Sequence, residues 1–329
     1  MKNIAIIGAG LSGLIAARQL ANVANVKIFE KSKGVGGRIA TRRSGPYSFD
    51  HGAQFFTPKT PLFKEFLEPI ILEGHVKHWD GNFAEIINRK IILKRKWDES
   101  PPHYVGAPSM NSFAKQLSIG ADIQKNTLIT SVTRENHLWQ ISDANGKLLG
   151  EYDWVLVSTP PNQALQLLPQ FLSLDSKLIT RRMQSCFSLM LGFSGDLALP
   201  FDAAVPLGED ISWISVNSSK PDRGQAYCLL IHSTNDWADQ HFENDRNVVL
   251  KHLVEETSCI LDRDINSAAH KTLHGWRFAN IARQEEKNYF LDANHNLAMC
   301  GDWFIKGRVE AAFTSGYKAA RAIEAILSD

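Results

Sequence analysis

The sequence predicts an α/β fold, α+β overall, in which both ends of the chain form one domain and the middle forms a second, mainly antiparallel one. At the N-terminus, a β-rich run ending in glycine (3–10) precedes a helical pattern (11–21) and a second strand-like run (25–32). Near the C-terminus, another apolar run (296–300) precedes a helical pattern over 309–327. Between these ends, short runs of alternating polar and apolar residues are typical of antiparallel strands.

The elements between the two ends follow from periodicity and turn residues. Residues 31–58 are rich in glycine and arginine, which predicts a loop with brief order. Further helices are predicted by apolar periodicity over four segments: 61–74, where Pro69 should bend or divide the helix, 109–120, 160–171 and 247–261. Strands are predicted in three regions: 76–97, 122–159 with turns at Glu135–Asn136 and Asn145–Gly146, and 184–283.

Composition limits the class of protein. The 36 basic and 35 acidic residues give a formal net charge of +1, which argues against nucleic acid or a membrane surface as partner. Four cysteines, at positions 186, 228, 259 and 300, lack the spacing of metal ligands or of a disulfide framework, so we expect free thiols and no metal site. The apolar N-terminal run is broken by three glycines, unlike a signal peptide, and we expect a cytoplasmic protein.

GAGLSG (residues 8–13) lies between the first predicted strand and the first predicted helix. In a dinucleotide-binding β-α-β unit, Gly8 permits the tight turn, Gly10 the close approach of a pyrophosphate, and Gly13 close helix–strand packing. The helix N-terminus offers N–H groups to phosphate. Glu30 ends the second strand, where an acid binds ribose hydroxyls and opposes a 2′-phosphate. This pattern predicts a Rossmann-like domain for NAD or FAD and disfavours NADP.

Two later segments bear on the choice between NAD and FAD. GGR (36–38) follows Glu30 closely and offers backbone approach and a guanidinium to phosphate, which an NAD domain does not need at this place. A basic surface loop is the alternative interpretation. FDHGAQFF (49–56) places His51 and Gln54 around a glycine-centred turn, and a packed histidine in a strand turn is the alternative there.

The order of these motifs resembles the flavin-containing amine oxidase superfamily, and most closely its renalase-like branch, including the bacterial members. GAGLSG, FEKS, GGR and DHGAQFF occur in that order, and CGDWFIKGRVEAAFTSG (300–316) completes the pattern. WISVNSSKPDR (213–223) and HGWRF (274–278) support the same resemblance, which covers nearly the whole chain.

The resemblance implies noncovalently bound FAD. It implies an FAD-binding domain of residues 1–75, 105–165 and 290–329, and a substrate domain of residues 76–104 and 166–289 that covers the flavin ring. The residues that it places at the cofactor are Gly8, Ala9, Gly10, Ser12 and Gly13 at the pyrophosphate, Glu30 and Lys31 at the ribose, Gly37 and Arg38 at the phosphates, His51, Gly52, Ala53 and Gln54 along the flavin, the backbone of Val132 at the adenine, Asp302 at the ribityl chain or phosphate, and Arg308, Val309, Glu310 and Ala312 near the isoalloxazine.

A substrate pocket for a nicotinamide ring is expected to be flat and partly aromatic. The candidates are Trp213, Asn217, Lys220, His232, Trp276 and Phe278, and the sequence identifies no catalytic acid–base pair. Asn217 and Lys220 suit the ribose or phosphate of a dinucleotide substrate; a β-turn with a solvated lysine is the alternative. For the aromatic residues and for His232, the alternative is ordinary packing.

Renalase-like proteins oxidise misreduced nicotinamide dinucleotides. The resemblance therefore implies an FAD-dependent oxidase that takes hydride from 2- or 6-dihydro-NAD(P) to give NAD(P)⁺, while O₂ reoxidises the flavin and forms hydrogen peroxide. A flavin amine oxidase acting on a small amine is one alternative, and a non-catalytic flavin-binding protein is another. The expected partners are a small dinucleotide substrate and O₂, with no nucleic acid and no membrane; the oligomeric state is left open.

Overall fold

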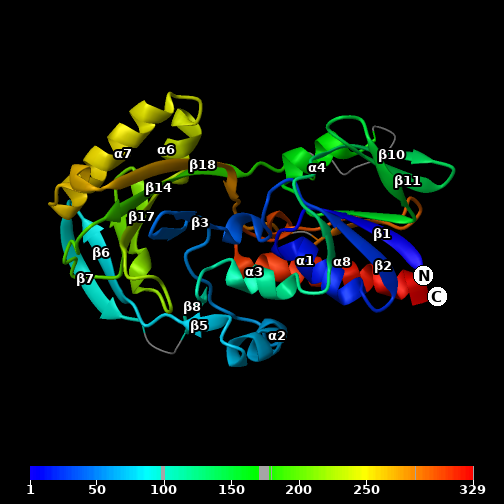
Figure 1. Cartoon of the computed structure of the whole chain (residues 1–329), viewed down its shortest axis with the longest axis horizontal. Helices are drawn as coiled ribbons and strands as arrows, with labels where there is room; N and C mark the ends of the chain where they lie inside the picture. Colours follow the sequence, from blue (N-terminus) through cyan, green and yellow to red (C-terminus); the bar gives the residue numbers. More distant parts are fainter. Residues whose placement is uncertain (98–100, 170–177, 179, 286, 329) are drawn as a thin grey trace. The chain divides into compact units, whose positions relative to one another are not determined.

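The computed structural model describes residues 1–97, 101–169, 178, 180–285 and 287–328, and the chain forms two compact units (Figure 1). Unit 1 comprises Met1–Gly37, Ala114–Met183 and Ile281–Asp329, and unit 2 comprises Arg38–Phe113 and Gln184–Asn280. The predicted domain boundaries differ from these units at four places. Residues 38–75 and 105–113 belong to unit 2, and the segments 166–183 and 281–289 belong to unit 1. Residues 98–100, 170–177, 179 and 286 of the predicted substrate domain lie outside the described residues.

Unit 1 is built on a six-stranded sheet. Its strand order is β19 (Phe290–Asp292), β20 (Leu297–Met299), β13 (Trp154–Val157), β1 (Lys2–Ile7), β2 (Ala24–Phe29) and β9 (Asp122–Gln124). All neighbours are parallel except β19 and β20, which are antiparallel. Four consecutive residues of β1, Ile4 to Ile7, are buried, as expected for a central strand covered on both faces. The Rossmann-like prediction is confirmed.

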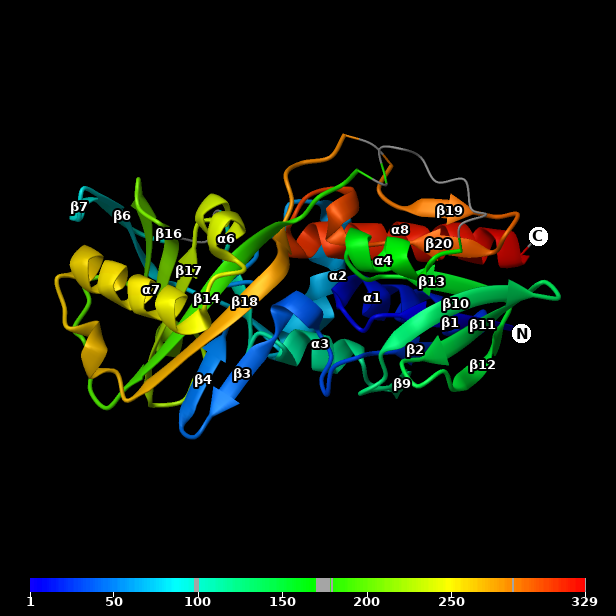
Figure 2. The same ribbon diagram turned by 90° about the horizontal axis from the view of Figure 1, so that it is seen from above.

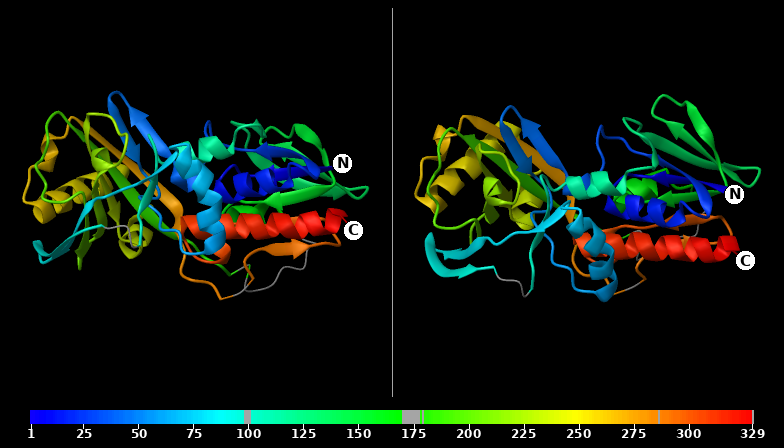
Figure 3. Two further views of the ribbon diagram at one scale, coloured as in Figure 1. Left: turned by 90° about the horizontal axis from the view of Figure 1, so that it is seen from below. Right: turned by 60° about the horizontal axis from the view of Figure 1, so that its bottom comes forward.

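Helices α1 (Leu11–Leu20) and α8 (Val309–Ser328) lie side by side in unit 1, as Figure 2 and Figure 3 show. A Cβ atom on Gly316 of α8 would lie only 2.3 Å from the Ser12 backbone oxygen of α1, so glycine permits this close packing. Ser12 Oγ also donates to the Ala312 carbonyl at 2.9 Å. The first and last helices of the chain therefore form one layer.

A three-stranded antiparallel sheet completes unit 1, with β10 (Ile129–Glu135), β11 (Leu138–Asp143) and β12 (Leu148–Tyr152). The first turn is Asn136–His137, both with positive φ, one residue later than predicted. The second reversal contains the predicted Asn145–Gly146. Helix α4 (Pro161–Leu167) follows β13, and the predicted extension to residues 170 and 171 lies outside the described residues.

Unit 2 is built on a seven-stranded sheet. Its order is β18 (His270–Asn280), β14 (Gln184–Phe193), β17 (Tyr227–Ser233), β16 (Ile211–Val216), β15 (Ala203–Leu207), β6 (Asn82–Ile87) and β7 (Lys90–Lys96). Only the β15–β6 pair is parallel among the described strands of this sheet. Helices α6 (Asn235–His241) and α7 (Arg246–Leu261) pack on it (Figure 1). Only α7 was predicted, because α6 is too short to show a periodic pattern.

The remaining elements of unit 2 are short. β3 (Thr41–Ser44) and β4 (Tyr47–Asp50) form a hairpin after a 3₁₀ turn, η1 (Gly37–Ile39), within the segment predicted as mostly loop. Helix α2 (Pro61–Leu72) runs through Pro69, so the predicted division does not occur. The other elements are β5 (Val76–His78), β8 (Tyr104–Gly106), α3 (Ser112–Leu117) and the 3₁₀ turns η2 (Asn217–Ser219) and η3 (Ile265–Ser267); η4 (Asp302–Phe304) belongs to unit 1. Among the described helices, none has the length and apolarity that crossing a membrane requires.

Candidate functional site

The glycines of the β1–α1 turn have different structural roles. Gly8 has φ of +104°, and a Cβ atom on it would lie 2.8 Å from Ser158 Oγ. A Cβ atom on Gly13 would lie 2.2 Å from the Gly8 carbonyl oxygen, so Gly13 is required for helix–strand packing. A Cβ atom on Gly10 would meet nothing within 4 Å among the described residues. The space in front of Gly10 is therefore open, as a bound pyrophosphate requires.

The N-terminus of α1 is a suitable anion site. Gly10 is its N-cap and makes no side-chain capping hydrogen bond. The second glycine segment lies against the turn, because Gly36 N donates to the Ala9 carbonyl at 2.8 Å. Gly37 has φ of +53°, and a Cβ atom on it would lie 3.4 Å from Gly10 Cα. Two glycine backbones and a helix N-terminus thus form a cradle whose shape and dipole fit phosphate.

Glu30 is held in position at the end of β2. Its side chain is buried, with 7% of the residue exposed. Its Oε2 accepts from Ala9 N and its Oε1 from Ser32 N, both at 2.8 Å. An ionised carboxylate has about four lone-pair sites, so two remain for ribose hydroxyls. The residues of this cradle therefore fit the dinucleotide part of a flavin cofactor, and Lys31 is exposed beside them.

The segment of unit 1 that precedes α8 contains the predicted cofactor residue Asp302. Asp302 opens η4 and is buried, and its backbone oxygen accepts from Ile305 N and Lys306 N at 2.9 and 2.8 Å. Trp303 Nε1 donates to the Thr159 carbonyl at 3.0 Å, so this aromatic side chain packs inside unit 1.

The other predicted cofactor residues of unit 1 occupy distinct places. Val309 and Glu310 lie in the first turn of α8, Arg308 is exposed just before it, and Val132 is buried in β10.

In unit 2, the turn at 51–54 is fixed from several sides. The His51 carbonyl accepts from Ser188 Oγ and Trp276 Nε1, both at 2.7 Å, and His232 Nε2 lies 3.4 Å from it. A Cβ atom on Gly52 would lie 1.9 Å from the Arg38 carbonyl oxygen, to which Ala53 N donates at 2.9 Å.

The turn thus brings together two predicted pocket residues, His232 and Trp276. It also brings in Ser188, which the sequence analysis missed because Ser188 lies in an otherwise apolar strand.

Three imidazoles near this turn are held neutral. The His51 ring lies 5.0 Å from the His274 ring and 5.1 Å from the Trp276 ring, measured between centroids. Burial, together with the nearby His274, Arg42 and His232, lowers the pKa of His51 to about 3. Burial is also the main cause that lowers the pKa of His232 and of His274 to about 4. At neutral pH these rings offer hydrogen bonds without charge.

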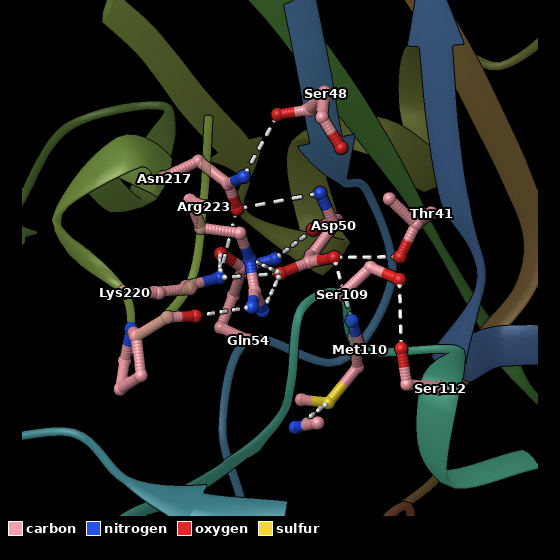
Figure 4. A network of polar contacts seen from close by, with 12 residues as sticks. Thr41, Ser48, Asp50, Gln54, Ser109, Met110, Ser112, Asn217, Lys220 and Arg223 are labelled. Carbon is pink, nitrogen blue, oxygen red and sulfur yellow. Dashed lines mark hydrogen bonds and ion pairs between the residues drawn. The ribbon is translucent and has the colours of Figure 1, made fainter. Parts of the chain in front are cut away.

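Asn217 and Lys220 are not available to a substrate in the way that the sequence predicted. Figure 4 shows both inside a polar network around Asp50. Lys220 Nζ donates to Asn217 Oδ1 at 3.0 Å, to Gln54 Oε1 at 3.2 Å and to Asp50 Oδ2 at 3.5 Å. An ammonium has three donors, and all three are used. The alternative of a solvated lysine is also wrong, because 2% of Lys220 is exposed.

Asp50 and Arg223 are functional candidates that the sequence analysis did not single out. Arg223 donates to Asp50 Oδ2 from Nη2 at 2.6 Å and from Nε at 3.2 Å. Thr41 Oγ1 and Met110 N donate to Asp50 Oδ1 at 2.6 and 2.9 Å. Although burial raises the pKa of Asp50, the charges of Lys220 and Arg223 outweigh it and lower the pKa to about 2. The sequence contained a signal for both residues. Asp50 precedes His51 in FDHGAQFF, and Arg223 ends WISVNSSKPDR, the motif that contains Lys220.

Trp213 belongs to a separate aromatic group in unit 2. Its ring centroid lies 5.6 Å from that of Phe55 and 6.2 Å from that of Trp97, with Trp97 nearly parallel. Phe278 is half-buried on β18, and Phe56 packs on Phe113. The six predicted pocket residues therefore divide among the His51 turn, the Asp50 network, this aromatic group and β18. Among the described residues, no three His, Cys, Asp or Glu side chains are placed to hold a metal ion.

Comparison with known proteins identifies the family. Residues 91–324, more than half of the chain, match the flavin containing amine oxidoreductase family, and residues 6–69 match the NAD(P)-binding Rossmann-like domain.

Three solved structures are similar to this chain. The chain is similar to a putative protoporphyrinogen oxidase from Exiguobacterium sp. 255-15, with a TM-score of 0.80 and 12% identity over 100% of this chain and 99% of that one. Cyclohexylamine oxidase from Brevibacterium oxydans IH-35A gives 0.74 and 12% over 100% of both chains. Wild-type putrescine oxidase bound to putrescine gives 0.73 and 13% over 98% of this chain and 99% of that one. The likeness of these structures concerns the fold. The family match carries the assignment: the chain belongs to the flavin containing amine oxidoreductase family and is a flavin-dependent oxidoreductase.

Proposed function

We propose that the cofactor is noncovalently bound FAD and that the enzyme oxidises dihydro isomers of NAD(P). The observation that carries the cofactor assignment is the open cradle of unit 1. The space in front of Gly10 is free of described atoms, the α1 N-terminus has no side-chain cap, and the buried Glu30 carboxylate keeps acceptor capacity. These features suit the pyrophosphate and the ribose of FAD.

A bound flavin would supply the redox chemistry, which is acceptance of a hydride from the substrate and reoxidation by O₂ to give hydrogen peroxide. The chain's own residues would bind and orient the cofactor and the substrate and would exclude water from them. The α1 N–H groups would hold phosphate, and N–H groups in the first turn of α8 would stabilise negative charge on a reduced flavin. The turn at 51–54 would serve the flavin ring, as the family resemblance implies, and the neutral His51 ring would add no charge there.

The substrate assignment rests on the renalase-like motifs and on the chemistry around the His51 turn. Hydride transfer from a dihydronicotinamide requires no proton to be removed, and the three nearby imidazoles have lowered pKa values that suit them poorly to general-base work at pH 7. The Trp276 ring, tilted by only 27° from the His51 ring, offers a flat aromatic surface.

A small amine is the second candidate substrate. The aromatic group of Trp213, Phe55 and Trp97 favours it, because the faces of indole and phenyl rings attract an amine cation. Two structural relatives are named as oxidases of cyclohexylamine and putrescine. The names of these two relatives support an amine as the second candidate substrate.

Anaerobic mixing separates the two candidates. The purified flavoprotein is mixed, in separate runs, with 2-dihydro-NAD(P), 6-dihydro-NAD(P), ordinary 4-dihydro-NAD(P) and a panel of small amines, and flavin absorbance is followed. We expect rapid bleaching by the 2- or 6-dihydro isomers, slow or no bleaching by amines, and peroxide on admission of O₂. Bleaching by amines alone would contradict the substrate proposal, and bleaching by neither class would favour a non-catalytic flavin protein.

A further inference from the structure

The network around Asp50 contains two buried cations and one buried anion (Figure 4). Three ionisable side chains meet there with almost no solvent exposure: the side chains of Asp50 and Lys220 are 0% exposed and that of Arg223 is 2% exposed. Arg223 balances the charge of Asp50 one for one, and its Nη2 and Nε both donate to Oδ2. Lys220 then adds a second cation 3.5 Å from the same oxygen, so the cluster of one anion and two cations has a charge of +1.

The hydrogen bonds of Lys220 do not explain this charge. Two of its three acceptors are the neutral amide oxygens of Gln54 and Asn217, which a neutral donor would satisfy equally well. Each oxygen also has another donor, Ser215 Oγ for Gln54 and Asp50 N for Asn217. Removing Lys220 would therefore leave neither oxygen without a partner.

Burying the second cation, Lys220, carries an unfavourable free energy. Burial lowers the pKa of Lys220 to about 8, against the opposing effect of Asp50, and Arg223 adds repulsion. The Trp79 ring, 5.3 Å from Nζ, recovers part of this cost by a cation–π contact. A buried charge that destabilises the fold indicates a functional use more often than an exposed one does.

The charge lies directly behind the turn at 51–54. Asp50 immediately precedes the turn, Gln54 ends it, and Lys220 donates to both. The Gln54 side chain also donates to the Asp50 and Gly52 carbonyls, so one set of hydrogen bonds joins the turn to the ammonium. Because the side chains of Lys220 and Asp50 are 0% exposed, bulk solvent screens the field of the ammonium at the turn only weakly.

We propose that Lys220 makes the turn at 51–54 electropositive and so stabilises an anion that lies against it. This inference rests on the proposed function, which places the flavin along that turn, and the anion is then the reduced flavin ring. Lys220 is a positioning and electrostatic residue: it touches neither substrate nor flavin, and it acts through Gln54 and Asp50.

The test compares purified holoenzyme carrying K220M with three controls: wild type, K220R, which keeps the charge, and K77M. Lys77 pairs with Asp222 at 2.7 Å near the same loop but is 43% exposed, so K77M removes a lysine without removing the buried charge. Each protein is assayed for flavin content, for flavin midpoint potential with reference dyes, and for the urea midpoint of unfolding.

We expect K220M to keep its flavin and to have a urea midpoint no lower than that of the wild type, while its equilibrium constant for two-electron flavin reduction falls by about tenfold, a potential about 30 mV lower. We expect wild-type potentials in K220R and K77M. An unchanged potential in K220M, or an equal shift in K77M, would overturn the inference while leaving the flavin assignment intact. If K220M is unfolded, K220Q is measured in its place against the same criteria. Absence of flavin from the wild-type protein would instead refute the proposed function.

Discussion

The cradle of unit 1 and the Asp50 network of unit 2 are built in opposite ways. The cradle consists mainly of backbone: Gly10 leaves room for a ligand, Gly8 and Gly13 permit close packing, and the α1 N–H groups supply the polarity. The network consists of charged and amide side chains, with Lys220 and Asp50 fully enclosed. The cradle leaves space for a ligand, whereas the polar groups of the Asp50 network form hydrogen bonds and ion pairs with one another.

This difference determines how each region responds to change. In the cradle, an added side-chain atom leaves the fold stable where space is open and destabilises it where the backbone is closely packed. In the network, the fold stays stable when an anion and a cation are removed together and is destabilised when one buried charge loses its partner. The predictions below test these two responses.

Asp50→Asn gives the largest expected loss of stability. It leaves Lys220 and Arg223 as two buried cations facing an amide, and breaking a buried pair in this way costs about 3–5 kcal/mol. The free energy of unfolding is measured in urea. The double variant D50N/K220M restores the original charge of +1, and we expect it to recover part of the loss. A loss no greater than that of D153N, whose surface partner Lys2 is 58% exposed, would contradict the account.

Gly13→Ala is expected to have the next largest effect. The new Cβ atom would lie 2.2 Å from the Gly8 carbonyl oxygen, which is backbone and cannot rotate away. Overpacking of this kind costs about 1–3 kcal/mol. The matched control is Gly34→Ala, at a glycine of the same unit where the added atom meets nothing within 4 Å of the described residues. Equal urea midpoints for the two variants would refute the packing role of Gly13.

Mild acid is expected to weaken unit 2 before unit 1. Burial lowers the folded-state pKa of His51, His232 and His274 below the ordinary value of 6.5, so the unfolded chain binds more protons as pH falls from 6.5 towards 4. Stability therefore decreases over that window. Hydrogen exchange is measured at pH 6.5 and 5.0 and corrected for the slower intrinsic exchange at the lower pH. Protection factors should fall more in β14, β17 and β18 than in β1. An equal fall in both units would contradict this assignment.

The sequence predicts the cradle well because its determinants are local. GAGLSG, Glu30 and GGR lie within 31 consecutive residues, and their spacing alone indicates a turn, a helix start and an acid. The network draws on Thr41, Asp50, Met110 and the segment 215–223, which only the folded chain brings together. Spacing could not show that Lys220 is enclosed, since a lysine after a serine-rich turn is usually exposed. Three of the elements that were missed or misplaced are likewise too short for periodicity to locate: α6, the β3–β4 hairpin and the Asn136–His137 turn.

FAD binding to Gly10→Ala tests the central claim most directly. Gly10 has φ of −70°, which alanine adopts readily, and the added Cβ atom meets no described atom within 4 Å. Wild-type apoprotein and G10A are titrated with FAD at equilibrium, and their urea midpoints are compared without cofactor. We predict one FAD per wild-type chain, released intact by acid precipitation, and an affinity at least about tenfold weaker in G10A at an unchanged urea midpoint. Equal FAD affinity in the two proteins would contradict the placement of the pyrophosphate in front of Gly10.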